Sequence, residues 1–282
     1  MKDTILYGDC RKTLCAFLPQ TARVCVTSPP YYGLRDYGGE DSQIGQEQTP
    51  EEFIDELVKV FREVRNVLTD DGTCWVNLGD SYYNYRPGRG QGLAKQTVSN
   101  NKQDLPDVCP RRGNKLEGFK EKDLIGIPWM FAFAMRADGW YLRQDIIWNK
   151  PNPMPESVRD RCTKSPEYIF LFSKSQNYYF DVDAIKEETR RKRSVWNVTK
   201  KPYKGAHFAV FPPELIEPCI LAGSEKGDIV LDPFIGSGTT AAVAKSLGRD
   251  YIGCELHEDY GKLIQKRIGE TQEPTLSILD II

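Results

Sequence analysis

The sequence predicts an α/β fold in which a largely parallel sheet is covered by helices on both faces. Short apolar runs alternate along the chain with segments of helical periodicity, which is the pattern of such folds. The 282 residues suit one domain of this class, and the 40% hydrophobic and 28% charged fractions are ordinary for a globular protein. We therefore expect a single domain over 1–282.

Each predicted element follows from its local pattern. Seven short apolar runs predict strands: Thr4–Tyr7, Val24–Thr27, Thr73–Leu78, Tyr141–Trp148, Tyr168–Phe172, Asp228–Leu231 and Tyr251–Cys254. Helical periodicity predicts five helices: Glu51–Leu68, Pro128–Ala137, Pro213–Ala222, Thr239–Leu247 and Glu258–Ile268. The first of these follows Thr49-Pro50 and ends before Asp71-Gly72, as helices typically start and stop. The runs at 141–148 and 168–172 have no helix between them, so an antiparallel pair is expected at one end of the sheet.

Composition excludes several classes of protein. With 38 basic and 40 acidic residues the net charge is −2, which excludes a basic protein that coats nucleic acid but permits a local basic groove. No run of about 18 apolar residues predicts a membrane span, and Met1–Cys10 lacks the apolar core of a secretory signal. The eight cysteines form no CxxC pair, and there are two histidines, so we expect reduced thiols and no metal site. The expected location is intracellular: cytoplasm or nucleoid in bacteria or phage, nucleus in a eukaryote.

Two basic segments interrupt the alternation. One lies at 84–120, where Arg86–Lys120 carries eight Lys/Arg against three Asp/Glu, and the other at 174–206, where Lys186–Lys204 carries eight against two. Charge composition alone favours a solvated surface loop, but aromatic residues lie among these charges and favour contact with nucleic acid. The residues of these segments expected to contact nucleic acid are Arg111, Arg112, Arg190, Arg191, Lys192 and Arg193.

A glycine-rich turn follows the sixth predicted strand. Residues 228–240 are DIVLDPFIGSGTT, and Glu255 ends the next strand nineteen residues after Gly236. Glycines let a backbone approach a nucleotide closely, and an acidic residue at the end of the next strand can bind ribose hydroxyls. No Lys follows the glycines, which excludes a P-loop. The turn alone leaves a nicotinamide-dependent oxidoreductase, or a turn without a ligand, as open alternatives.

A second turn ends the strand Val24–Thr27 with Ser28-Pro29-Pro30-Tyr31. Neither proline can donate to a sheet ladder, so the strand must stop there, at the edge where open α/β sheets bind ligands. An aromatic amine is a poor nucleophile. The Ser28 hydroxyl and the Pro29 carbonyl could bind its hydrogens and expose its lone pair, and Tyr31 offers a ring on which a flipped base could stack.

Together the two motifs resemble those of amino-group DNA methyltransferases, DPFIGSGTT matching FxGxG and SPPY matching the catalytic (D/N/S)PP(Y/F) signature. The resemblance implies S-adenosylmethionine as cofactor and a Rossmann-like fold with a seven-stranded sheet. Because the catalytic turn precedes the cofactor turn, it implies the circularly permuted β class, with Thr4–Tyr7 beside the strand that ends at Glu255. The implied cofactor residues are Asp9, Phe211, Pro212, Asp232, Phe234, Gly236, Ser237, Gly238, Thr239, Thr240 and Glu255. Trp148 and Lys150, with Arg161 and Glu167, resemble the segment that frames the flipped base and contacts DNA, and Asp80 closes a strand near the same edge.

The resemblance implies a site-specific methyltransferase acting on double-stranded DNA, and SPPY is the form most associated with cytosine N4. Adenine N6 remains the main alternative, because the same two acceptors suit either amine. An inactive DNA-binding module and RNA or protein amide substrates are further alternatives. A restriction endonuclease partner and a homodimer are possible, and no membrane partner is expected.

Overall fold

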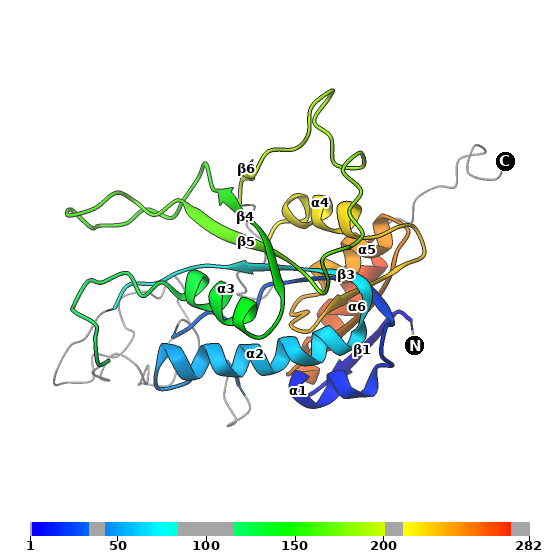
Figure 1. Cartoon of the computed structure of the whole chain (residues 1–282), viewed down its shortest axis with the longest axis horizontal. Coiled ribbons are helices and arrows are strands. Elements are labelled where there is room, and N and C mark those ends of the chain that lie inside the picture. Colours follow the sequence, from blue (N-terminus) through cyan, green and yellow to red (C-terminus); the bar gives the residue numbers. More distant parts are fainter. Residues whose placement is uncertain (1, 34–42, 84–115, 201–210, 272–282) are drawn as a thin grey trace.

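The computed structural model describes residues 2–33, 43–83, 116–200 and 211–271. Its centre is a mixed sheet between two layers of helices (Figure 1), which confirms the expected α/β fold. The strands are β1 (Thr4–Tyr7), β2 (Ala22–Thr27), β3 (Leu68–Leu78), β4 (Tyr141–Asn149), β5 (Pro166–Ser173), β6 (Val195–Asn197), β7 (Ile229–Asp232) and β8 (Asp250–Glu255). Their order across the sheet is β1-β8-β7-β2-β3-β5-β4-β6.

The five expected helices are present close to their expected bounds. The helices are α1 (Cys10–Thr13), α2 (Pro50–Val67), α3 (Ile127–Ala137), α4 (Pro213–Gly223), α5 (Thr239–Ser246) and α6 (Gly261–Gly269), with single 3₁₀ turns at Leu14–Ala16 and Glu258–Tyr260. Helix α1 was not expected, because four residues are too few to show a helical period. No helix in the described ranges has the length and apolar character needed to cross a membrane.

Strand pairing determines which edge of the sheet holds the carboxyl ends of the parallel strands. The strands β1, β8, β7, β2 and β3 are mutually parallel, so their carboxyl ends lie along one edge of the sheet. The pairing of β1 with β8, in which Tyr7 lies opposite Glu255, confirms the permuted order. Strands β4 and β5 form the expected antiparallel pair. The sheet has eight strands where seven were expected, because β6 adds a three-residue edge strand parallel to β4 that is too short to show a pattern.

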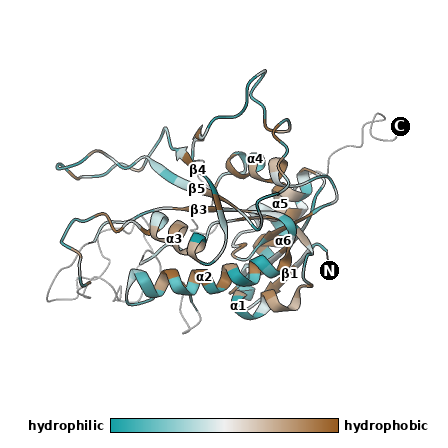
Figure 2. Cartoon of the chain, viewed as in Figure 1, coloured by the Kyte–Doolittle hydropathy of each residue, from teal (hydrophilic) through white to brown (hydrophobic). Residues whose placement is uncertain are grey.

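The sheet is buried on both faces. Alternate residues of β3 point to opposite sides: Cys74 and Val76 lie in the core that includes α2 and α3, whereas Trp75 lies in the core that includes α4 and α5. Helix α2 packs its apolar stripe on the first core, and Figure 2 shows hydrophobic and hydrophilic residues alternating along it. Its first turn is fixed by a capping box between Thr49 and Glu52.

Candidate active site

The two turns singled out in the sequence follow neighbouring strands. Strand β2 leads into Ser28-Pro29-Pro30-Tyr31 and strand β7 leads into the glycine turn, and β2 pairs with β7 through Val24 opposite Val230. Because both strands run in the same direction, both turns leave the sheet at its carboxyl edge, where open α/β sheets bind ligands.

Asp232 joins the two turns from inside the protein. Its carboxylate accepts hydrogen bonds of 2.6 Å from the Thr27 and Thr240 hydroxyls, and one of 3.0 Å from the Phe234 amide. The side chain is buried, and burial raises its pKa to about 6 in spite of these three donors. All three donors come from the protein itself, so Asp232 holds β2, β7 and α5 together at this edge.

The glycine turn and Glu255 form a candidate cradle for a nucleoside. Gly236 and Gly238 have φ of 52° and 81°, in the left-handed region that favours glycine. At Gly253, opposite the turn, a Cβ would lie 2.6 Å from Ile235. Glu255 at the end of β8 is 8% exposed, and burial raises its pKa to about 7. A closely approachable backbone beside a buried carboxylate fits the ribose of an adenosyl cofactor.

The hydroxyls of the same turn have protein partners. The Arg267 guanidinium on α6 donates to Ser237 at 2.7 Å and also to Thr239, and Thr240 donates to Asp232. The sequence pattern did not single out Arg267, because a basic residue in the last turn of a helix is ordinary.

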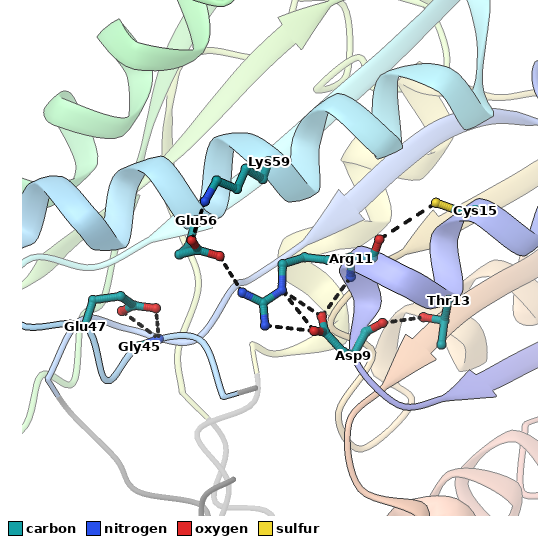
Figure 3. A network of polar contacts seen from close by, with 8 residues as sticks. All are labelled: Asp9, Arg11, Thr13, Cys15, Gly45, Glu47, Glu56 and Lys59. Carbon is teal, nitrogen blue, oxygen red and sulfur yellow. Dashed lines mark hydrogen bonds and ion pairs between the residues drawn. The ribbon is translucent and has the colours of Figure 1, made fainter. Parts of the chain in front are cut away.

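Asp9 follows β1 at the same edge and is held by a polar network (Figure 3). Its carboxylate caps α1 by accepting the Arg11 amide at 2.9 Å, and it pairs with the Arg11 guanidinium at 2.8 Å. Arg11 also pairs with Glu56 of α2. Of the two other expected contacts, Pro212 caps α4 and Phe211 packs on the core beneath that helix.

Behind the catalytic turn lies a buried polar cluster. The Tyr31 hydroxyl donates to Glu167 Oε2 at 2.6 Å, and Lys150 Nζ pairs with Glu167 Oε1 at 2.5 Å. Asn77 donates to the same Oε2 at 3.3 Å, and its carbonyl oxygen lies 3.5 Å from the Ser28 hydroxyl. Asn77 was not expected in the site, although a polar residue inside the apolar run of β3 was the available signal.

Tyr31 also forms one wall of a small cavity. A Cβ on Gly79 would lie 2.6 Å from the Tyr31 ring, so the ring rests directly on the backbone that follows β3. The cavity beside it is lined by Tyr31, Tyr32, Gly79, Asp80, Ser81 and Ile127. Asp80 turns its carboxylate to the Gly126 and Ile127 amides, so it caps α3.

Trp148 and Lys150 were expected to contact DNA, but the structure places both side chains in the interior. Trp148 is 2% exposed and its indole nitrogen donates to the Val198 carbonyl at 2.8 Å. Lys150 is 8% exposed and faces Glu167. Trp148 lies near the end of β4 and Lys150 directly follows that strand, and Val198, after β6, covers the Trp148 indole nitrogen, so neither side chain presents a surface to a phosphate.

The run Arg190–Arg193 of the second basic segment lies just before β6. Arg190, Arg191 and Arg193 are exposed, whereas Lys192 pairs with Glu187 at 2.8 Å and lies over the Trp196 ring. Arg111 and Arg112 lie outside the described residues, as do residues 84–115 of the first basic segment and residues 201–206 of the second.

Known proteins match this chain over nearly its whole length. The family model described as DNA methylase, for N6 and N4 methyltransferases, matches residues 22–266. The chain belongs to this N6/N4 DNA methylase family. It is 48% identical over 270 residues to the type II methyltransferase M.Cfr9I of Citrobacter freundii, covering 94% of this chain and 87% of that protein. It is also 48% identical to M.SmaI of Serratia marcescens over 94% of this chain and 90% of that one.

Solved structures agree with the fold of this methylase. The PvuII DNA methyltransferase, titled cytosine-N4-specific, superposes with a TM-score of 0.71 at 20% identity, over 98% of this chain and 89% of that one. A putative DNA modification methylase of Thermus thermophilus, in complex with S-adenosyl-L-methionine, gives a TM-score of 0.64 at 25% identity over 95% and 93% of the two chains. The expected fold and family are thereby confirmed.

Proposed function

We propose that this methylase transfers a methyl group from S-adenosylmethionine to the exocyclic N4 amine of a flipped-out cytosine at a specific site in double-stranded DNA. One observation carries the proposal: Ser28-Pro29-Pro30-Tyr31 and the glycine turn leave adjacent parallel strands at one edge. The SPPY form of the turn and the similarity in fold to a methyltransferase titled cytosine-N4-specific support cytosine over adenine.

The proposed chemistry depends on positioning. Ser28 Oγ and the Pro29 carbonyl oxygen accept the two amine hydrogens, which draws the nitrogen lone pair out of conjugation with the ring. The Tyr31 ring, supported by Gly79, offers a face on which the displaced base stacks. S-adenosylmethionine supplies an electrophilic methyl group when bound. Glu255 would bind the ribose hydroxyls, Asp9 and Phe234 would contact the adenine, and Phe211, Pro212, Thr239 and Thr240 would contact the methionine end.

Nucleoside analysis of plasmid DNA incubated with labelled S-adenosylmethionine tests the proposal. We expect label in N4-methylcytosine. Label in N6-methyladenine would support methyl transfer to an exocyclic amine but show that the target base is adenine. The absence of labelled nucleosides on DNA of varied sequence would overturn the proposed activity. Ser28→Ala should reduce labelling by about 100-fold or more, as the loss of one preorganised polar contact does elsewhere. The matched control is Ser246→Ala at the far end of α5, which should label normally.

We propose that the exposed arginines before β6, with Lys192, contact DNA phosphates. The type II names of the relatives support a restriction endonuclease of the same specificity as partner. A homodimer stays a prediction, which sedimentation of the protein with and without DNA would test.

A further inference from the structure

The polar cluster behind the catalytic turn is continuous from Ser28 to a buried carboxylate. The Ser28 and Tyr31 hydroxyls both lie against Asn77 Oδ1, at 3.5 and 3.3 Å, and the Tyr31 hydroxyl donates to Glu167 at 2.6 Å. Glu167 is 9% exposed, and its other oxygen faces Lys150. Ser28 and Tyr31 follow β2, Glu167 lies on β5 and Lys150 follows β4, so the β2 turn and the β4–β5 hairpin converge on one carboxylate.

Methylation of an amine creates a need that this cluster can meet. When the amine nitrogen bonds to the methyl carbon, the carbon–sulfur bond breaks and its electron pair remains on sulfur. The nitrogen then carries a positive charge and one proton too many, and such an N-protonated amine is a far stronger acid than a carboxylic acid. A proton acceptor within reach of Ser28 would complete the reaction.

Asn77 is adjacent to Ser28 but cannot take this proton. Its amide nitrogen is occupied as a donor to Glu167 at 3.3 Å and to the Tyr168 carbonyl at 3.1 Å, and a neutral amide is not a base near neutral pH. Among the described side chains that contact Tyr31, Glu167 is the one with a carboxylate.

We propose that Glu167 is the terminal acceptor of the proton that the methylated amine releases, and that the proton reaches it through Ser28 and Tyr31. This inference rests on the proposed function. In the proposed step the N–H bond breaks and leaves its electron pair on nitrogen, while Ser28 Oγ gains that proton. Ser28 passes its own hydroxyl proton to the Tyr31 oxygen, and Tyr31 passes its proton to Glu167 Oε2. The carboxylate becomes a neutral acid, and Lys150 keeps its charge.

The charges around Glu167 suit this role. Burial alone would raise the pKa of Glu167, but Lys150, the Tyr31 hydrogen bond and Lys200 outweigh it and hold the pKa below its usual value. Lys164 adds a further positive charge toward Glu167. Burial and the Glu167 carboxylate raise the pKa of Tyr31 well above its usual value, so Tyr31 keeps its proton and points it at Glu167. Before each transfer, Glu167 is therefore ionised and can accept a proton, and Tyr31 carries the proton that it would pass on.

Single-turnover methylation with saturating DNA and cofactor tests the relay. Glu167→Gln keeps the shape and an acceptor for Tyr31 but cannot take a proton, and it should slow transfer by about 100-fold. Tyr31→Phe should slow transfer similarly, and the double variant should be no slower than the slower single variant, because both break one relay. Protonation of Asp232, whose pKa is about 6, can slow transfer in both proteins. The wild-type rate should fall further at lower pH as Glu167 becomes protonated, because the pKa of Glu167 lies below its usual value, and Glu167→Gln should lack that second fall.

A second substitution that restores activity would distinguish a proton-accepting role of Glu167 from a packing role. Asn77→Asp introduces a carboxylate beside both Ser28 and Tyr31. The double variant Asn77→Asp with Glu167→Gln should therefore transfer methyl groups at least about tenfold faster than Glu167→Gln alone. Glu156→Gln, which breaks an ion pair with Arg161 in the same hairpin, is the matched control and should transfer normally. Cofactor and DNA affinities, measured by calorimetry and fluorescence anisotropy, should be unchanged in Glu167→Gln.

The outcomes distinguish the two proposals. If the wild-type protein labels cytosine and Glu167→Gln transfers at the full rate, the relay is overturned and the proposed function stands. A slow Glu167→Gln with an unchanged acidic limb and no rescue by Asn77→Asp also overturns it and leaves Glu167 a packing role. Wild-type protein that labels no DNA base overturns the proposed function, and the relay with it.

Discussion

The Thr27 hydroxyl donates a 2.6 Å hydrogen bond to Asp232, across 205 residues of sequence. Thr27 is the last residue of β2 before Ser28, and Asp232 is the last residue of β7 before the glycine turn. This buried contact therefore helps to set the separation between the proposed base site and the proposed cofactor site. In-line methyl transfer depends on that separation, because misplacement of reacting groups by about 1 Å can cost about 100-fold in rate.

Thr27→Val should weaken both stability and activity. It keeps the side-chain shape but leaves the buried Asp232 without one donor, so the free energy of unfolding should fall by about 1–3 kcal/mol. Urea denaturation measures this change, and single-turnover transfer should slow by about tenfold or more. Thr199→Val, at an exposed threonine, is the control and should leave unfolding unchanged. Equal stability of Thr27→Val and wild type would show that the contact contributes nothing.

Cofactor affinity should depend on pH through Glu255. Its pKa is about 7 in the free protein because of burial, and ribose hydroxyls donate best to its charged form. Binding therefore favours deprotonation, so the affinity should be constant above pH 7 and weaken below it, by up to about tenfold per pH unit. Calorimetric Kd values at pH 8, 7, 6 and 5.5 measure the trend. Glu255→Gln should bind more weakly at pH 8 and show no such trend, and a wild-type Kd that is flat down to pH 5.5 would contradict the assignment.

Gly79→Ala should disturb the catalytic turn without touching the cofactor site. The new Cβ would lie 2.6 Å from the Tyr31 ring, so the ring must move. We expect a loss of about 1–3 kcal/mol in stability, as for other overpacked sites, and transfer slowed by at least about tenfold. Gly269→Ala, where a Cβ meets nothing within 4 Å, is the matched control. A normal rate for Gly79→Ala would mean that the position of Tyr31 is unimportant.

Charge reversal before β6 should weaken DNA binding. Arg190→Glu combined with Arg191→Glu should lower affinity and reduce the slope of log K against log salt by about 2, since each phosphate contact contributes about 0.9. Cofactor affinity should stay unchanged. Lys226→Glu with Lys245→Glu makes the same change in net charge near the opposite edge of the sheet and should leave the slope alone. An unaltered slope in the arginine variant would remove this segment from the DNA-binding surface.

The location of the site could be predicted from local sequence. Pro29 and Pro30 must end a strand, and the glycines before α5 must form a tight turn, so both motifs could be assigned to the carboxyl ends of strands. The alternation of strands and helices then implied that these ends share an edge. The neighbourhood of β1 and β8 was also predictable, but only through the resemblance to permuted methyltransferases.

The cluster around Glu167 could not be predicted in the same way. Its assembly depends on the antiparallel register of β3 with β5, in which Asn77 lies opposite Ile169, and a one-residue slip would turn these side chains to the other face. The expectation that Trp148 contacts DNA came from the resemblance of its segment to the one that frames a flipped base. No pattern in the sequence indicated that the short strand β6 runs alongside Trp148, which is buried.

The pairing of β1 with β8 also has a consequence for biosynthesis. A ribosome releases β1 before β8, so β1 has no partner strand to pair with until β8 has emerged. Until then Glu255, at the end of β8, is absent from the sheet edge. The carboxylate proposed to bind the ribose is therefore set in place after both turns of the proposed site have been made, and a chain interrupted before β8 would lack it.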